Sequence, residues 1–303
     1  MKMLKQIINV LQQYGIDYEY SGDPEYSFEA FCPLNCLKDN CIIWARGREN
    51  LNIEEINRYH NMLIFLEKGI SVPELQCEKI YVEKVHRTYF RVLSVLFNEL
   101  DPLNRKAGIS KSAVIETTNI GEELYVGNQS YIGPDVVIGN NVTIMNNVTI
   151  QGYVTIGDET VIESGTVIGV CGFGYYHDEE GHPVCVPHFG GVRIGSHVMI
   201  GANNAISRGC LADTIIEDYV KTDNMCHIAH NDHIKQGAML TANTVISGST
   251  TVGENVWLAP GTLLNNSIVV GDNSYTGIGA VATKDIPAGK VVVGMPAKVL
   301  RDR

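Results

Sequence analysis

The chain has 303 residues, of which 45% are hydrophobic and 19% are charged. This is the composition of a globular protein with ample apolar surface to bury, and it excludes a disordered chain. The formal net charge of −11 argues against a nucleic-acid partner, because neutralising phosphates requires a basic surface. A small phosphate-bearing ligand needs only a local basic cluster and is compatible with this charge.

The first hundred residues are predicted to form a small α/β domain over residues 1–101. Its opening segment carries apolar residues at helical spacing, namely Leu4, Ile7, Ile8, Val10 and Leu11. This run is too short and too interrupted for a signal peptide or a membrane span, so we expect a cytoplasmic protein with no membrane span. Further helices are expected at 53–61 and 88–100, and extended segments at 18–20, 41–45 and 79–82.

An aliphatic residue recurs at every sixth position from Ile120 to Ile168, and glycine often follows it. This period belongs neither to an α-helix nor to an alternating strand; it is typical of a parallel β-helix, in which six residues form one side of a triangular coil. The predicted fold class is therefore mainly β, with a left-handed parallel β-helix over 102–285; the handedness is that of known hexapeptide-repeat proteins. We expect the glycine or asparagine after each aliphatic residue to turn the corner at positive φ.

The six-residue register is interrupted twice before it ends. An extruded loop is predicted at 170–191, and the ten-residue step from Ile206 to Ile216 predicts a smaller bulge at 210–213. Loops of a solenoid gather on one face, which is usually the functional one. Residues 286–303 are expected to form a C-terminal tail.

Three histidines, His227, His230 and His233, follow closely on the pair Asp223-Asn224. On a helix this spacing would suggest a metal site, but on a coil His227 and His233 hold equivalent positions on successive sides of the prism. They therefore point apart and cannot share an ion within one chain. His230 lies near a corner, where its side chain can reach a cleft between neighbouring subunits.

The eight cysteines form no pair separated by two residues, which argues against a zinc ribbon and a redox dithiol. We expect them to be reduced thiols of a cytoplasmic protein, and we expect no metal.

At these residues the sequence resembles the UDP-3-O-acylglucosamine N-acyltransferases of lipid A synthesis, within the hexapeptide acyltransferases. The resemblance covers most of the chain, with matching segments at 85–97, 172–175, 187, 200–203, 208–209, 223–224 and 230–231. It implies that His230 is the catalytic base and that Asp223 and Asn224 support the site. It also implies a homotrimer with its sites between subunits.

The same resemblance implies that the N-terminal domain binds the nucleobase of the substrate, with Trp44 as the candidate stacking residue. The residues expected to contact the substrate elsewhere are Phe173, Gly174, Tyr175, His188 and Asn231. For the oxyanion of the transition state, the backbone N–H of Gly248 is the expected donor, because Gly248 lies eighteen residues after His230 and therefore one coil above it.

Two features depart from that family. Its usual second histidine is Ser267 here, and the segment 277–301 is instead similar to the end of coenzyme A-dependent sugar acetyltransferases. This second similarity implies acetyl-coenzyme A as co-substrate. The residues it places at the coenzyme are Gly279, Ala280, Lys284, Lys298 and Arg301, together with Gly248.

We therefore predict an acyl-coenzyme A-dependent N-acyltransferase, most simply an N-acetyltransferase, that acts on a UDP- or dTDP-linked amino sugar in lipopolysaccharide or glycan biosynthesis. His230 is the general base, since imidazole can take and release a proton near neutral pH. Four alternatives stay open: an acyl-carrier-protein-dependent enzyme of lipid A type, a sugar O-acetyltransferase, a non-catalytic binding solenoid, and a zinc enzyme resembling carbonic anhydrases. The last would use His177, Asp178, His182 and His188.

Overall fold

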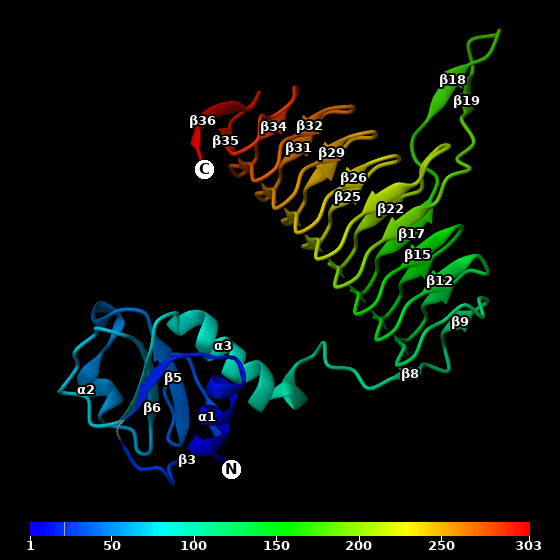
Figure 1. Cartoon of the computed structure of the whole chain (residues 1–303). Coiled ribbons are helices and arrows are strands. Elements are labelled where there is room, and N and C mark those ends of the chain that lie inside the picture. Colours follow the sequence, from blue (N-terminus) through cyan, green and yellow to red (C-terminus); the bar gives the residue numbers. More distant parts are fainter. Residues whose placement is uncertain (21) are drawn as a thin grey trace. The chain divides into compact units, whose positions relative to one another are not determined.

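The computed structural model describes residues 1–20 and 22–303, which form two compact units, Met1–Asn104 and Arg105–Arg303 (Figure 1). The first unit is a small α/β domain and the second is a parallel β-helix. The division between them falls after residue 104, against the sequence-based expectation of residue 101.

The N-terminal unit is built on a five-stranded sheet in the order β2-β7-β6-β5-β4, parallel except for β2. Its strands are β2 Tyr18–Tyr20, β4 Ala30–Phe31, β5 Cys41–Ala45, β6 Leu63–Glu67 and β7 Glu78–Val82. A short antiparallel pair consists of β1 Lys2–Met3 and β3 Ser27–Phe28. The helices are α1 Leu4–Gln13, α2 Ile53–Ile56 and α3 Val85–Leu96, with 3-10 turns η1 Arg48–Asn50 and η2 Asn98–Leu100.

Three helix boundaries differ from the sequence-based expectation; one is the end of α3 at Leu96, since Asn98–Leu100 form a separate 3-10 turn. α2 ends at Ile56, against the expected residue 61. The next N–H groups, of Arg58 and Tyr59, bond three residues back in place of four, and the Asn57 side chain bonds to the chain at Glu74 and Gln76. α3 begins at Val85, three residues early, because Val85 is fully buried against the sheet. Contacts with residues outside the helices therefore act at the end of α2 and at the start of α3.

Three parallel sheets form the sides of the β-helix (Figure 1). The first contains β8 Gly108–Ile109, β10 Tyr125–Val126, β13 Thr143–Ile144, β16 Val161–Ile162, β21 Met199–Ile200, β24 Lys221–Thr222, β27 Met239–Leu240, β30 Trp257–Leu258, β33 Tyr275–Thr276, β35 Lys290–Val293 and the antiparallel β36 Lys298–Asp302. The second contains β9 Val114–Ile115, β11 Tyr131–Ile132, β14 Thr149–Ile150, β17 Val167–Val170, β22 Ala205–Ser207, β25 His227–Ile228, β28 Val245–Ile246, β31 Leu263–Leu264 and β34 Val281–Ala282. The third contains β12 Val136–Ile138, β15 Val154–Ile156, β20 Val192–Ile194, β23 Thr214–Ile216, β26 His233–Ile234, β29 Thr251–Val252 and β32 Val269–Val270.

The predicted stacking of aliphatic residues is confirmed by the strand register. Ile132 pairs with Ile150 and Ile150 with Ile168, so residues eighteen apart lie one above the other. These side chains are fully buried and belong to one continuous apolar core that runs along the prism. Each coil thus buries its apolar face only against its neighbours, which is how a solenoid is stabilised.

The corner geometry differs from the expectation. Positive φ occurs three residues after the inward aliphatic residue, as at Asn141, Asn147 and Asn231. Of the glycines that directly follow an inward aliphatic residue, Gly169 has a positive φ, of 88°, whereas Gly121 and Gly157 do not. Space requires glycine at two of these positions: a Cβ at Gly121 would lie 2.5 Å from the Gly139 backbone, and one at Gly157 would lie 2.6 Å from Gly195. The next coil approaches too closely for any side chain there.

Both interruptions of the register are present in the structure. The longer one projects away from the coils as a β-hairpin of β18 Tyr175–His177 and β19 Pro183–Cys185 (Figure 1). The coil closes behind it, since Ile162 pairs with Ile200. The smaller bulge packs against the returning loop through a hydrogen bond of 2.6 Å from Phe189 N to Cys210 O.

The C-terminal segment continues the coil further than expected. Ile286 bridges to Val270 and β35 pairs with β33, so residues assigned to a tail complete a last turn of the solenoid. β36 then folds back antiparallel on β35 and covers the exposed edge of the sheet. Across residues 1–20 and 22–303, no helix is both long enough and apolar enough to span a membrane. All eight cysteines are free.

Candidate active site

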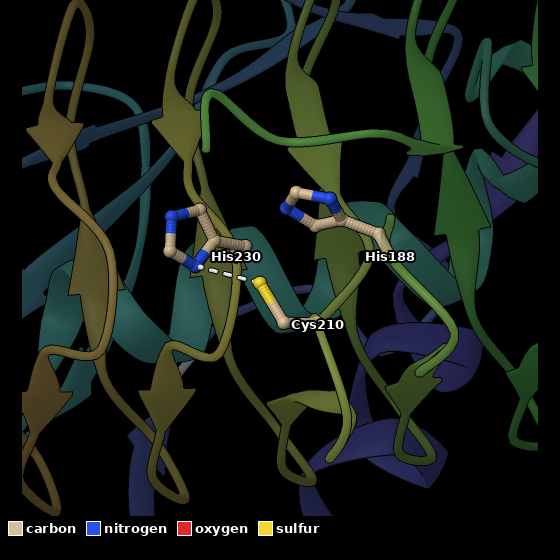
Figure 2. Close-up of side chains that lie close together, drawn as sticks. All are labelled: His188, Cys210 and His230. Atoms are coloured by element: carbon tan, nitrogen blue, oxygen red, sulfur yellow. Dashed lines mark hydrogen bonds between the residues drawn. The ribbon is translucent and has the colours of Figure 1, made fainter. Parts of the chain in front are cut away.

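His230 occupies the corner between β25 and β26. The inward position at this corner is taken by the fully buried Ile228, and Asn231 makes the turn at a φ of 62°. His230 therefore points outward from the prism, half-buried, toward the base of the extruded loop. Figure 2 shows it beside Cys210 and His188.

Asn231 fixes the proton position on the His230 ring. Its Nδ2 donates to the Ala212 carbonyl at 2.9 Å, and its Oδ1 accepts from the Cys210 N–H at 3.1 Å. The atom facing His230 Nδ1, also at 3.1 Å, is therefore the acceptor Oδ1. This network assigns the proton to Nδ1 and leaves Nε2 with a free lone pair, the form that a general base requires.

His188 lies in the segment that follows β19 and returns to the coils, and it is 6% exposed. Its Nδ1 donates to the Val186 carbonyl at 2.8 Å, so Nε2 carries the lone pair. Within the described part of the chain, His188 Nε2 is buried and has no hydrogen-bond partner. The two imidazole rings stand edge to face, with centroids 5.3 Å apart and planes at 77°.

Cys210, from the small bulge, completes the group. Its Sγ lies 3.8 Å from His230 Nδ1, and burial raises the pKa of the thiol. One ligand atom each from His188, Cys210 and His230 lie within 4.8 Å of one another. The sequence placed a bulge at 210–213 but did not single out Cys210, since nothing in the spacing shows that the bulge folds toward His230.

Two glycines enclose the His230 ring. A Cβ at Gly248 would lie 2.8 Å from Cε1 and 2.9 Å from Nε2, and a Cβ at Gly172 would lie 2.7 Å from Cδ2. Gly248 therefore lies against the ring, as its position eighteen residues after His230 implied. Gly174 adjoins the other imidazole, since its Cβ would lie 3.3 Å from His188 Cε1.

Asp223 and Asn224 lie at the preceding corner and are exposed. Asn224 Oδ1 accepts from the Ala202 N–H at 2.8 Å, and the Asp223 carbonyl accepts from Asn204 Nδ2 at 3.0 Å. Among the hydrogen bonds of the described residues, none joins this pair to His230. Within one chain the pair therefore supports its own corner.

The other predicted substrate residues of the loop face solvent. Phe173 is 88% exposed and Tyr175 is half-exposed, with their ring centroids 4.9 Å apart. The four residues of the proposed zinc alternative do not gather in one place: Asp178 and His182 lie close to Glu180 on the hairpin, whereas His188 lies with Cys210 and His230.

His227 and His233 lie in different sheets, as the register predicted. Burial lowers the pKa of His227, which favours its neutral form. His233 Nε2 lies 2.6 Å from the carboxylate of Glu217. Neither side chain belongs to the group around His230.

In the N-terminal unit, Trp44 borders a pocket of about 610 Å³. Its ring meets His86 edge to face at 5.0 Å. The remaining lining residues are Pro33, Leu34, Ala45, Arg46 and Asn50. An aromatic face beside an arginine suits a nucleobase with its phosphates.

The residues predicted to bind the coenzyme differ in their exposure to solvent. Gly279, Lys284, Lys298 and Arg301 are exposed near the end of the solenoid. Ala280 is fully buried in it and offers no side-chain surface to a ligand.

Comparison with known proteins agrees with this architecture. The family described as bacterial transferase hexapeptide (six repeats) matches residues 117–152 and 136–169. A UDP-3-O-acylglucosamine N-acyltransferase from Helicobacter pylori is 32% identical over 261 residues, covering 83% of this chain and 77% of that protein. The chain belongs to the UDP-3-O-acylglucosamine N-acyltransferase family. The resemblance stated from the sequence is therefore confirmed.

A UDP-3-O-acylglucosamine N-acyltransferase 2 from Legionella pneumophila is 49% identical over 142 residues, covering 47% of this chain. The match spans about two-fifths, 41%, of the length of that relative. Among solved structures, a UDP-N-acetylglucosamine acyltransferase from Bacteroides fragilis superposes with a TM-score of 0.59 at 26% identity, over 64% of this chain and 74% of its own. A related structure from Acinetobacter baumannii, at 20% identity and a TM-score of 0.58, shares the fold. The left-handed parallel β-helix predicted for this family member is thereby established.

Proposed function

We propose that this family member transfers an acyl group from a thioester to the amine of a nucleotide-linked amino sugar, with His230 as general base. The observation that carries the proposal is the bond from His230 Nδ1 to Asn231, which leaves Nε2 free to accept a proton. The relatives' name, UDP-3-O-acylglucosamine N-acyltransferase, supports a UDP-linked amino sugar as substrate class.

The proton and electron balance of the transfer is simple. The amine attacks the thioester carbon, and His230 Nε2 takes the proton that the amine loses. The tetrahedral intermediate then collapses, the C–S bond breaks, and the imidazolium returns the proton to the departing sulfur. Imidazole suits both steps because its unperturbed pKa is about 6.5.

The oxyanion of that intermediate requires a hydrogen-bond donor, and Gly248 is our candidate. Its backbone adjoins the His230 ring, where a Cβ would lie 2.8 Å from Cε1. Among the described residues, the Gly248 N–H makes no backbone hydrogen bond. A donor that is free and already in place stabilises developing negative charge without reorganisation.

For the acyl donor we propose acetyl-coenzyme A. Lys298 and Arg301 project from β36 at the exposed end of the solenoid, where they suit the phosphates of a coenzyme in an otherwise acidic protein. The alternative is an acyl carrier protein as donor.

We further propose that the N-terminal unit binds the nucleotide at the pocket beside Trp44 and Arg46. A chain beginning near Leu103 should still form the solenoid, because coil stacking is local. It should bind the nucleotide sugar much more weakly than the full chain; equal affinity would show that the β-helix alone recognises the substrate.

A homotrimer with sites between subunits completes the proposal. It gives a role to Asp223 and Asn224, which support a different corner within their own chain. A neighbouring subunit can bring such a corner to His230. Light scattering of the full chain in solution tests the trimer; a monomer would leave the pair outside the site.

The decisive experiment incubates the full chain with a panel of UDP- and dTDP-linked amino sugars and either acetyl-coenzyme A or an acyl carrier protein donor. Mass spectrometry of the products identifies the acyl chain and the atom that receives it. Acetylated amine supports the proposal in full. If product forms only with the acyl carrier protein, the carrier protein and not acetyl-coenzyme A is the donor. If the product is an O-acyl ester, a hydroxyl group and not the amine is the acceptor.

A further inference from the structure

The group around His230 has the donor atoms of a zinc site. Two imidazoles and one thiol, from His188, Cys210 and His230, place one ligand atom each within 4.8 Å of the others. Figure 2 shows the three side chains converging from separate elements: the returning loop, the bulge and the corner after β25. Zinc favours this mixture of nitrogen and sulfur ligands in tetrahedral geometry.

The separation of Cys210 Sγ and His230 Nδ1 fits such an ion with little movement, and the other two separations are at most 4.8 Å. With Zn–S near 2.3 Å and Zn–N near 2.0–2.1 Å, ligand atoms of a tetrahedral site stand roughly 3.3–3.6 Å apart. Cys210 Sγ and His230 Nδ1 are 3.8 Å apart. A contraction of a few tenths of an ångström therefore suffices for this pair.

His188 supplies an independent observation. It is 6% exposed, and its Nδ1 is held by the Val186 carbonyl, which leaves Nε2 as a buried acceptor without a partner among the described residues. Leaving a buried polar atom unsatisfied costs free energy, so such an atom at a cluster of ligands calls for an occupant. A cation bound to Nε2 meets that need, and the bond to Val186 orients the ring as in many metal-binding histidines.

We propose that His188, Cys210 and His230 bind a soft divalent cation of the Zn²⁺ type, with a fourth position open to water. Residue spacing did not predict this site, because its three residues are spread over 188–230 and only the fold brings them together. On binding, the Cys210 thiol releases its proton to solvent and the thiolate coordinates the ion.

Occupancy of this site excludes base catalysis by His230. When Nδ1 gives its lone pair to the ion, the proton of the neutral ring moves to Nε2, the atom that would otherwise accept the proton of the amine. The ion therefore inhibits acyl transfer. This consequence rests on the proposed function, whereas metal binding itself does not.

Cobalt titration of the metal-free full chain tests the site directly. One equivalent of Co²⁺ should bind and give a thiolate-to-cobalt charge-transfer band. Cys210→Ser should abolish the band, and His188→Gln should weaken binding by more than about 100-fold, the upper limit for losing only a neighbour of a ligand. Circular dichroism checks that both variants keep the β-helix.

Two matched controls exclude other binding groups. Cys185→Ser removes an exposed cysteine of the hairpin, and Asp178→Asn removes a carboxylate of the second group on the hairpin, which offers no thiol. Both variants should keep the band and the stoichiometry. A band that survives in Cys210→Ser, or the absence of equimolar binding, overturns the site.

Inhibition is measured separately, as the Zn²⁺ concentration that halves acyl transfer. This concentration should rise at least about tenfold in Cys210→Ser relative to the unaltered chain, whatever the turnover of the variant. If the cobalt band is normal but zinc does not inhibit, the metal site stands, and the proposal that the ion blocks base catalysis by His230 is wrong. If no pair of donor and acceptor is turned over, the proposed function is wrong. The cobalt spectrum still shows whether the three residues bind a metal ion.

Discussion

Asn231 Oδ1 lies 3.1 Å from His230 Nδ1, and the same oxygen accepts the Cys210 N–H. The amide thus holds the imidazole in one tautomer. Asn231→Gly removes this hold without backbone strain, because glycine readily adopts the φ of 62° found here. We expect turnover to fall by about 10- to 10³-fold, since the tautomer with its proton on Nε2 cannot act as the base.

The matched control for this change is Asn255→Gly. Asn255 is also a corner asparagine with a left-handed φ, of 53°, but it is exposed and lies away from the histidines. Its replacement should leave steady-state turnover unchanged. Equal activity losses in the two variants would mean that corner rigidity, and not the tautomer, is what the asparagine supplies.

His230→Ala should lower turnover by roughly 10²- to 10⁴-fold, the range for losing a positioned acid-base group. Folding should be spared, because the inward position at this corner is held by Ile228. The free energy of unfolding should change by less than about 1 kcal/mol. His227→Ala and His233→Ala should retain far more activity; if His227 proves indispensable instead, the site is wrongly placed.

Gly248→Ala tests the space beside the ring. The added Cβ would lie 2.8 Å from Cε1 of His230, so the imidazole has to turn away and lose its bond to Asn231. Turnover should fall by about 10- to 10²-fold with little change in melting temperature. Gly133→Ala is the control, because its Cβ would meet no atom nearer than 3.5 Å. Full activity in Gly248→Ala would remove Gly248 from the site.

The sequence was informative wherever a residue repeats. Inward aliphatic residues such as Ile150 and Ile228 recur in register, so the coils, the interruptions and the outward direction of His230 followed from spacing. β6 escaped prediction because residues 63–66 are buried on both faces of the sheet and show no alternation. An alternating pattern arises only in a strand with one buried and one exposed face, and both faces of β6 are buried.

The site itself was only partly accessible from sequence. His230, Asn231 and Gly248 belong to consecutive coils, so their proximity follows from the eighteen-residue repeat. Cys210 and His188 reach the same place through the two interruptions, whose paths depend on contacts such as that of Phe189 N with Cys210 O. A repeat carries no information about segments that leave it.

Lys298→Glu tests the coenzyme proposal. Lys298 is exposed on β36, and reversing its charge should repel the phosphates of acetyl-coenzyme A. We expect KM for the coenzyme to rise roughly tenfold, about 1.4 kcal/mol, with kcat little changed. Lys111→Glu, an exposed lysine on the first coil, is the control for net charge. If both changes raise KM equally, or if neither does, the end of the solenoid does not bind the donor.

Asp232 makes stability depend on pH. Its carboxyl group is fully buried and accepts hydrogen bonds of 2.9 Å from Ala229 N and Thr250 N, and burial raises its pKa from 3.8 to about 8. The folded state therefore holds this proton more tightly than the unfolded state does. The contribution to the free energy of unfolding is fully present below about pH 4 and declines as pH rises through about 8, by at most about 1.4 kcal/mol per pH unit. Urea unfolding of metal-free protein from pH 4 to 9 measures this slope, and Asp232→Asn, which cannot ionise, should flatten it. An unchanged slope in Asp232→Asn would assign the pH dependence to other groups.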